Sequence, residues 1–354
     1  MKPVVVMLSI NLALAGVNIL LKEILSEGIS QLVIVMYRQT ISALFLSPIA
    51  YFWERKTRPQ LTAYILFLLF ISSLVGLTLT LYLFLIGLQY TSATFSCAFL
   101  NLVPVNTFIL AVLFGMEKVD MKSKGGRAKV LGTLVCISGN LILILYKGMP
   151  LTSPGSATGK TNGVHPTVQP ERPERWLIGS LVLTAGCFMW SSWFLMQSRV
   201  GKVYPCQYSS TCIMSFFSAI QSVVLHLIID TKNSVFVVKG KSAILSLIYA
   251  GSVGSGLCYV GMSWCVKKKG PVFTAAFTPF MELFAAIFDF FILHEQIHLG
   301  SVVGSVLIIS GMYILLWGKD REAKECAVKQ TVSVEEGYGD STIPSSNTNA
   351  VEQI

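Results

Sequence analysis

Two carboxylates stand in an apolar run near the end of the chain. Glu282 and Asp289 lie in FTPFMELFAAIFDFFILHEQIH, so a helix would place them on one face, about 10 Å apart along its axis. Ionised groups inside a membrane are costly and by default mark a substrate pathway, a proton relay or an internal ion pair. Glu282 is thus a candidate proton-responsive or amine-binding carboxylate. A hydrogen-bonded packing role is the alternative for both, and Asp289 also lies near enough to the end of the run to reach water.

The same run ends in HEQIH, which fits the H-E-x-x-H pattern of zinc proteases, with two His on one helical turn and a Glu as base. No third ligand is apparent. Glu295 matches Glu117 in an earlier, related segment, FGMEKV, which has no His at either position. We therefore expect no catalytic residue, metal or cofactor, and keep an intramembrane zinc hydrolase as the alternative of another class.

Arg38 is the cation that could pair with these carboxylates. It stands about two helical turns inside another apolar run, at a depth similar to that expected for Asp289. Arg38 would then be a gate or a structural partner near the outer face. Snorkelling of its long side chain to the membrane surface is the other interpretation.

Further polar side chains recur at helical spacing in two more runs. Amide and indole N–H groups can bind the carboxylate or amine of a solute, and Trp rings can flank its apolar part. Interhelical hydrogen bonds and interfacial aromatic rings are the alternative. These residues are Asn11, Asn18 and Lys22 in one run, and Trp190, Trp193 and Gln197 in the other.

Two prolines could break or bend their helices where a solute is met, although a plain kink is common. Pro104 and Pro279 occupy nearby positions in two related segments, and Pro279 aligns with Asn101. Thr278 extends the polar and small-residue stripe of Glu282. Asn101, Pro104, Thr278 and Pro279 complete the set of candidate pathway residues.

The elements that must position these side chains are membrane helices. Of 354 residues, 53% are hydrophobic and 13% charged, with a mean hydropathy of +0.66. Ten apolar runs reach or approach the length needed to cross a bilayer. They cover residues 4–24, 31–52, 62–87, 93–115, 130–146, 177–198, 208–229, 243–265, 272–293 and 300–317. The eight Cys stand singly and predict small core residues rather than a disulfide or metal framework.

The basic residues predict the orientation. With ten spans, the loops on the side of the termini carry 18 Lys and Arg, the opposite loops carry 8, and Arg38 lies within a span. The positive-inside rule then places both termini in the cytosol. This distribution accounts for the net charge of +9 without a nucleic-acid partner.

The chain divides into two similar halves. LGTLVCISGNLILIL (131–145) aligns with VGSVLIISGMYILLW (303–317), and Phe99 to Glu117 aligns with Phe277 to Glu295 at constant spacing. We expect a five-helix unit at 1–147, a flexible non-cytosolic linker at 148–176, a second unit at 177–318 and a disordered cytosolic tail at 319–354. Because five is odd, the second unit is inverted, an architecture typical of secondary transporters.

Several segments together resemble one family. They are GVNILLKEIL, YRQ at Arg38, YTSATFSCAFLNLVPVNTFILAVLFGME, WFLMQ before Tyr204-Pro205, and FTPFMELFAAIFDFFILHEQIHLGSVVGSVLIISGMYILLWGK. The chain is similar to the plant nodulin-like UMAMIT transporters, related to the Walls Are Thin protein, in the EamA branch of the drug/metabolite transporter superfamily. The resemblance covers nearly the whole chain and implies ten helices in the plasma or vacuolar membrane.

That resemblance, together with the repeat, predicts an all-α membrane transporter without enzymatic activity. Its expected partners are the lipid bilayer, a small-molecule substrate and protons. The expected cargo is an amino acid, exported or moved in both directions by alternating access, and auxin-like indoles or other small metabolites are the alternative. The cavity should be lined by the first, third, fourth, sixth, eighth and ninth runs. No motif fixes the substrate, flux direction, proton coupling, choice of membrane or oligomeric state.

Overall fold

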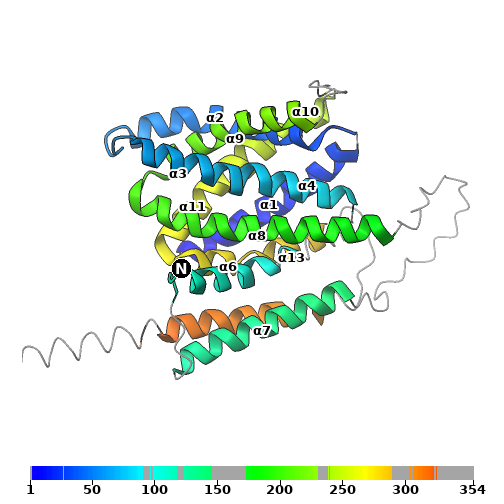
Figure 1. Ribbon diagram of the computed structural model, residues 1–354, viewed down its shortest axis with the longest axis vertical. Helices are drawn as coiled ribbons and strands as arrows, with labels where there is room; N and C mark the ends of the chain where they lie inside the picture. The colour runs from blue at the N-terminus through cyan, green and yellow to red at the C-terminus, as the bar shows by residue number, and fades with distance from the viewer. Residues whose placement is uncertain are drawn as a thin grey trace, which may run out of the picture.

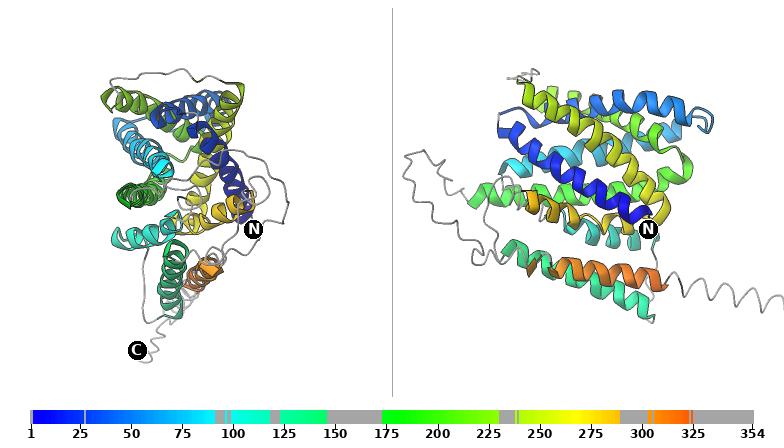
Figure 2. Two further views of the ribbon diagram at one scale, coloured as in Figure 1. Left: turned by 90° about the vertical axis from the view of Figure 1, so that its right-hand side faces the viewer. Right: turned by 180° about the vertical axis from the view of Figure 1, so that it is seen from behind.

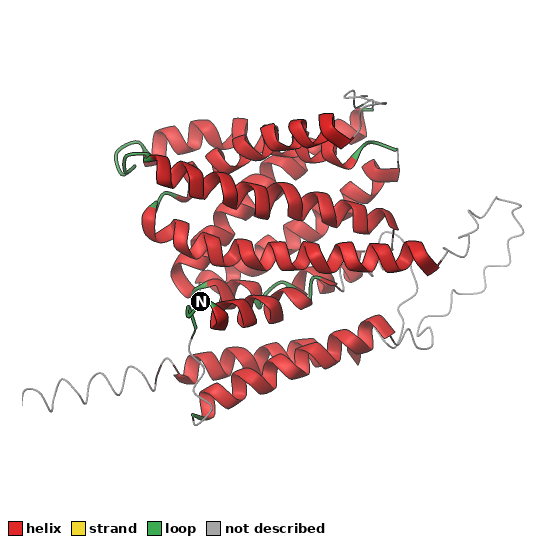
Figure 3. Ribbon diagram, viewed as in Figure 1, coloured by secondary structure: helices red, strands yellow, loops and turns green. Residues whose placement is uncertain are grey.

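The protein, seen in a computed structural model, consists of helices joined by turns and loops in its described residues, which contain no strand (Figure 3). The structure describes residues 2–26, 28–90, 96, 99–117, 123–145, 173–229, 238, 240–288, 303–304, 306–322 and 324. Within this part of the chain, each of the ten predicted apolar runs contains helical residues.

In the described part of the chain, six helices are long and apolar enough to cross a membrane (Figure 1). They are α1 (Lys2–Ser26), α2 (Gln31–Glu54), the continuous α3 (Ala63–Ser73), η1 (Leu74–Leu79) and α4 (Thr80–Tyr90), α8 (Pro173–Val203), α9 (Gln207–Ile229), and the continuous α10 (Lys241–Tyr249), η2 (Ala250–Leu257) and α11 (Cys258–Lys269). The other described helices are α6 (Leu102–Leu113), α7 (Lys124–Leu145), α12 (Pro271–Ala275), α13 (Pro279–Phe288) and a C-terminal helical segment at 306–322. The all-helical membrane fold is thus confirmed.

The distribution of side chains is that of a protein surrounded by lipid. Large apolar residues such as Leu44, Leu113 and Leu245 are exposed on the outside of the helices. Small polar residues such as Ser215 and Ser218 are buried between them. Lipid solvates apolar side chains as well as the protein interior does, so close packing and interhelical hydrogen bonds hold the helices together.

Two of the long helices contain a π-helical segment in the middle. A π turn widens the helix and releases a backbone carbonyl, and such turns are frequent at functional sites. At the start of α4, Thr80 Oγ1 donates to Val75 O of η1 at 2.7 Å, and Gln221 Nε2 of α9 donates to Phe70 O of α3 at 3.2 Å. Side chains therefore satisfy carbonyl groups beside the widened turn, as a membrane interior requires.

The ninth run, expected as one helix, is broken in the structure. α12 ends at Ala275 and α13 begins at Pro279. The backbone between them forms turns closed by hydrogen bonds between residues three apart, such as Thr278 N donating to Ala275 O at 3.0 Å. Pro279 has no N–H and fits the first position of a helix, where no intrahelical partner is needed. The break therefore coincides with the proline.

At one end of the row of helices, α2 packs along α9 (Figure 1, top). Their close approach is permitted by small residues, and Ser42 Oγ and Ser215 Oγ are hydrogen bonded at 3.0 Å. At the opposite end, α7 lies beside the C-terminal segment 306–322, and both views in Figure 2 show this pair next to α6, α12 and α13.

Glycines bring α7 and the C-terminal segment together in antiparallel order. A Cβ built on Gly132 would lie 2.6 Å from Gly311 O, and Cys136 Sγ donates to Ile308 O at 3.5 Å. The facing glycine pairs are Gly125 with Gly318, Gly132 with Gly311, and Gly139 with Gly304. Any side chain at these positions would force the two backbones apart.

Candidate substrate cavity

A small cavity lies in the middle of the row, between helices of both halves of the chain. The space open to the centres of water molecules is about 20 Å³, enough for about one or two waters. The cavity is lined by Leu14, Val17, Asn18 and Leu21 of α1, Arg38 of α2, Leu81, Phe84 and Leu85 of α4, Leu100, Trp190 of α8, Tyr259 of α11 and Met281 of α13. It is therefore mostly apolar, with its polar groups supplied by a few residues.

Arg38 is the charged residue among the described residues of the cavity wall. Arg38 is only 3% exposed, and among the described residues no acidic group forms an ion pair with it. The Nε atom has no hydrogen-bond partner there either. A buried guanidinium without a counter-charge is costly, so Arg38 is held in a position that favours an anion.

Aromatic rings form one side of the cavity. The rings of Trp190 and Tyr259 are stacked, with centroids 6.4 Å apart and planes 29° apart. Trp193 meets Tyr259 edge to face at 5.0 Å and lies behind this wall rather than in it. The wall combines apolar faces with the N–H of Trp190 and the O–H of Tyr259.

The π segment η2 lies close to Arg38 because two of its residues that face α2 are glycines. A Cβ built on Gly254 would lie 3.0 Å from Val17 and 3.5 Å from Nη2 of Arg38, and one on Gly251 would lie 2.9 Å from Arg38 O. The backbone of η2 therefore packs directly against α2 beside the guanidinium. In η1, the indole ring of Trp193 lies directly on Gly76.

Three of the candidate pathway residues meet in the cavity, namely Asn18, Arg38 and Trp190. Others are buried outside its wall, where they make local contacts. Asn11 Nδ2 donates to Met7 O at 2.8 Å, Gln197 Nε2 lies 3.2 Å from Met214 Sδ, and Thr278 Oγ1 donates to Ala275 O at 2.7 Å. Each of these three side chains thus has a partner away from the cavity wall.

The remaining candidates lie near helix ends or outside the cavity wall. Asn101 precedes α6 and is buried, while Pro104 stands in the first turn of that helix, where proline is tolerated. Pro279 begins α13, and Lys22 is partly exposed on α1. Pro104 therefore lies at the start of its helix rather than kinking the middle.

The structure describes the two candidate carboxylates, Glu282 and Asp289, only in part. Glu282 belongs to α13, directly after the cavity residue Met281, but its side chain lies outside the described residues. Asp289 and the HEQIH segment also lie outside them. Among the residues that the structure describes, no three His, Cys, Asp or Glu side chains gather as a metal site would.

Tyr259 is the polar cavity residue that sequence reasoning missed. It lies two residues after the η2 segment AGSVGSGL, in the helix that packs against α1 and α8. A polar aromatic residue beside a glycine-rich stretch within an apolar run was the available signal. Met281, Leu100 and the α4 residues offered none, because apolar residues abound in every span.

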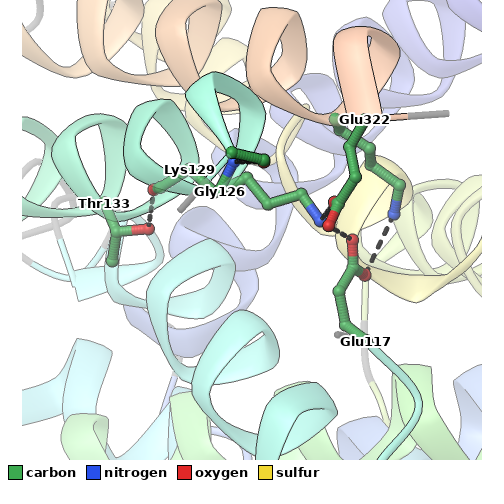
Figure 4. A network of polar contacts seen from close by, with 7 residues as sticks. Glu117, Gly126, Lys129, Thr133 and Glu322 are labelled. Atoms are coloured by element: carbon green, nitrogen blue, oxygen red, sulfur yellow. Dashed lines mark hydrogen bonds and ion pairs between the residues drawn. The ribbon is translucent and has the colours of Figure 1, made fainter. Parts of the chain in front are cut away.

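A second polar cluster lies outside the cavity, between the α6–α7 connection and the C-terminal segment (Figure 4). Glu117 Oε1 accepts from Lys129 Nζ at 3.1 Å, and its Oε2 accepts from Lys319 Nζ at 3.1 Å. Lys129, whose side chain is 3% exposed, also pairs with Glu322. Two cations and two anions thus neutralise one another in a largely buried network.

The fold and the cavity define a multi-pass helical membrane protein. The family model described as EamA-like transporter family matches residues 1–145 and 177–317. A WAT1-related protein of Arabidopsis thaliana is 49% identical over 329 residues, covering 93% of this chain and 90% of that protein. Another from the same plant is 50% identical over 323 residues, covering 91% and 88%.

The chain therefore belongs to the EamA-like transporter family, in its WAT1-related branch, and is a membrane transporter. A solved crystal structure with 13% sequence identity shares the fold, with a TM-score of 0.61 over 90% of this chain and 99% of the other.

Proposed function

We propose that the protein carries amino acids across the plasma or vacuolar membrane, as an exporter or bidirectional facilitator that works by alternating access. The observation that supports this most is the cavity, where Asn18, Arg38, Trp190 and Tyr259 meet in otherwise apolar walls. Such a mixture suits a small organic solute with a charged end and an apolar body. Carriage involves no covalent step, so the proposed mechanism assigns no catalytic residue.

The proposed mechanism rests on two inverted units, 1–147 and 177–318, with both termini in the cytosol. The helix pairs α2 with α9, and α7 with 306–322, join corresponding elements of the two units at either end of the molecule. The cavity lies between these ends, where both units contribute helices. Rocking of one unit against the other would expose it to each side in turn.

An auxin-like indole is the second candidate cargo. The stacked Trp190 and Tyr259 rings offer a flat apolar surface that suits an indole as well as an amino-acid side chain. Flux measurements with both solutes separate the two proposals.

The testing experiment measures efflux of a labelled amino-acid mixture from oocytes expressing the chain, at two external pH values. We expect efflux that exceeds that of uninjected cells. The Glu282→Gln variant should lose efflux or its pH dependence, because this change removes the proposed proton-responsive carboxylate. Asp320→Asn, at an exposed site in the C-terminal segment, is the matched control.

Absence of amino-acid efflux from cells with surface-expressed protein would refute the amino-acid assignment, and indole flux is then measured. Efflux that Glu282→Gln leaves unchanged at both pH values would assign this residue to packing.

A further inference from the structure

We propose that Arg38, with Tyr259 and Trp190, forms a carboxylate-binding subsite, so that the transporter selects solutes by their carboxylate group. This inference rests on the proposed transport function and deepens it by naming the group that is recognised. It applies equally to amino acids and to indole carboxylic acids, which share this group.

The first argument is the charge of Arg38. The guanidinium is buried within the cavity wall, and no described acidic side chain neutralises it. Removing a cation from water costs several kcal/mol unless an anion and hydrogen bonds compensate. A solute carboxylate entering the cavity would supply both, and the planar guanidinium matches a carboxylate with two parallel hydrogen bonds.

The second argument is the inventory of hydrogen-bonding groups. Arg38 Nε, Trp190 Nε1 and Tyr259 Oη are all buried without a hydrogen-bond partner among the described residues. Arg and Trp side chains can only donate, and a Tyr hydroxyl can donate as well. Three unpartnered donors lining one cavity are complementary to an acceptor-only group such as a carboxylate, and not to an ammonium.

The third argument is the packing that fixes these donors. Gly251 and Gly254 let the backbone of η2 lie directly against Arg38, and the Trp190 ring is stacked on Tyr259. Apart from Asn18, the other residues of the cavity wall, including Phe84 and Met281, are apolar. The subsite therefore binds the charged end of a solute. The cavity holds only about one or two waters in this conformation, so its apolar walls must separate during the transport cycle to receive the rest of the solute.

The test compares acids with their amides, which have nearly the same shape but lack the negative charge. Labelled phenylalanine and phenylalaninamide form one pair, and indole-3-acetate and indole-3-acetamide form the other. Whichever acid the wild-type protein carries, its amide should be transported about 10- to 100-fold more slowly, the loss typical of a charged hydrogen-bonded partner.

Variants at Arg38 connect this selectivity to the residue. Arg38→Gln should abolish transport of the acid, and Arg38→Lys should retain part of it, because Lys keeps the charge without the fork of donors. Arg58→Gln is the matched control, since Arg58 donates to Ser209 Oγ at 3.0 Å away from the cavity wall. It should preserve both transport and the preference for acid over amide.

A binding measurement on purified wild-type protein keeps the inference testable if Arg38 variants do not fold. The carried acid should raise the unfolding temperature and its amide should not. Equal transport or equal stabilisation by acid and amide would overturn the carboxylate subsite while leaving the transport function intact. If the wild-type protein moves and binds neither acid, both the cargo assignment and the subsite are wrong.

Discussion

Gly76 allows Trp193, which was predicted to bind substrate, to pack directly on the helix backbone, because glycine has only a hydrogen atom in place of a side chain. Trp193 was expected to flank a solute, yet its indole ring lies on the η1 backbone at Gly76, outside the cavity wall. The residue one turn earlier, Trp190, lines the cavity. Helical spacing placed both on one face, but only the neighbouring backbone determines which of them reaches open space.

Substitution of Gly76 tests this packing. A Cβ at position 76 would lie 1.8 Å from Cδ1 of Trp193, so Gly76→Ala must displace the ring or separate the helices. We expect a loss of about 1–3 kcal/mol in stability, as for other overpacked sites. Thermal unfolding in detergent measures it.

Gly186→Ala is the matched control, because its Cβ would meet Leu83 at an ordinary 3.4 Å. A Gly76→Ala protein as stable as the Gly186→Ala protein would contradict the close contact between Trp193 and η1.

At the scale of elements, the facing glycines predict the register between α7 and the segment 306–322. Cys136 Sγ lies 3.5 Å from Ile308 O. An Ile308→Cys variant should therefore form a disulfide with Cys136 upon mild oxidation. The two halves, cleaved at an engineered protease site within 148–172, should then remain joined on a non-reducing gel.

Tyr313→Cys serves as the control for this cross-link, because Tyr313 is exposed on the same segment. A further Cys136→Ser change should abolish the product. Equal cross-linking at positions 308 and 313 would show that the register described here is wrong.

The sequence predicted where helices occur but not where they break. A proline signals a possible interruption, and the structure has one at Pro279 but places Pro104 in a first turn. The π turns in η1 and η2 were not predicted, because a single inserted residue leaves the apolar pattern of a span almost unchanged. These irregular segments depend on partners such as Gln221, which bonds the Phe70 carbonyl.

At the scale of the whole molecule, the Glu117 network joins the α6–α7 connection to the C-terminal segment. Glu117→Gln removes the carboxylate charge at this position. Of the two carboxylates of the network that pair with the buried Lys129, only Glu322 then remains charged. We expect the free energy of unfolding to fall by about 1.5–3 kcal/mol, the contribution of a hydrogen bond between charged groups. Thermal unfolding in detergent again provides the measurement.

The exposed pair Lys324 and Asp320 provides the comparison. Its side chains are 75% and 64% exposed, and Lys324→Gln should change stability by less than about 0.5 kcal/mol. Equal effects of the two substitutions would mean that the buried network contributes no more than a surface pair.

The sequence by itself determined the membrane class, the apolar runs and the family, because these follow from composition, run length and motif similarity, which need no long-range contacts. It also singled out Arg38 as a cation within an apolar run, and left open whether its side chain pairs internally or reaches the membrane surface. Only the tertiary structure decided that Arg38 shares a cavity with Trp190 and Tyr259 while Trp193 and Gln197 pack elsewhere. The physical reason is that hydropathy fixes depth in a membrane, whereas the direction of each side chain depends on helix rotation, broken turns and glycine contacts between segments far apart in the chain.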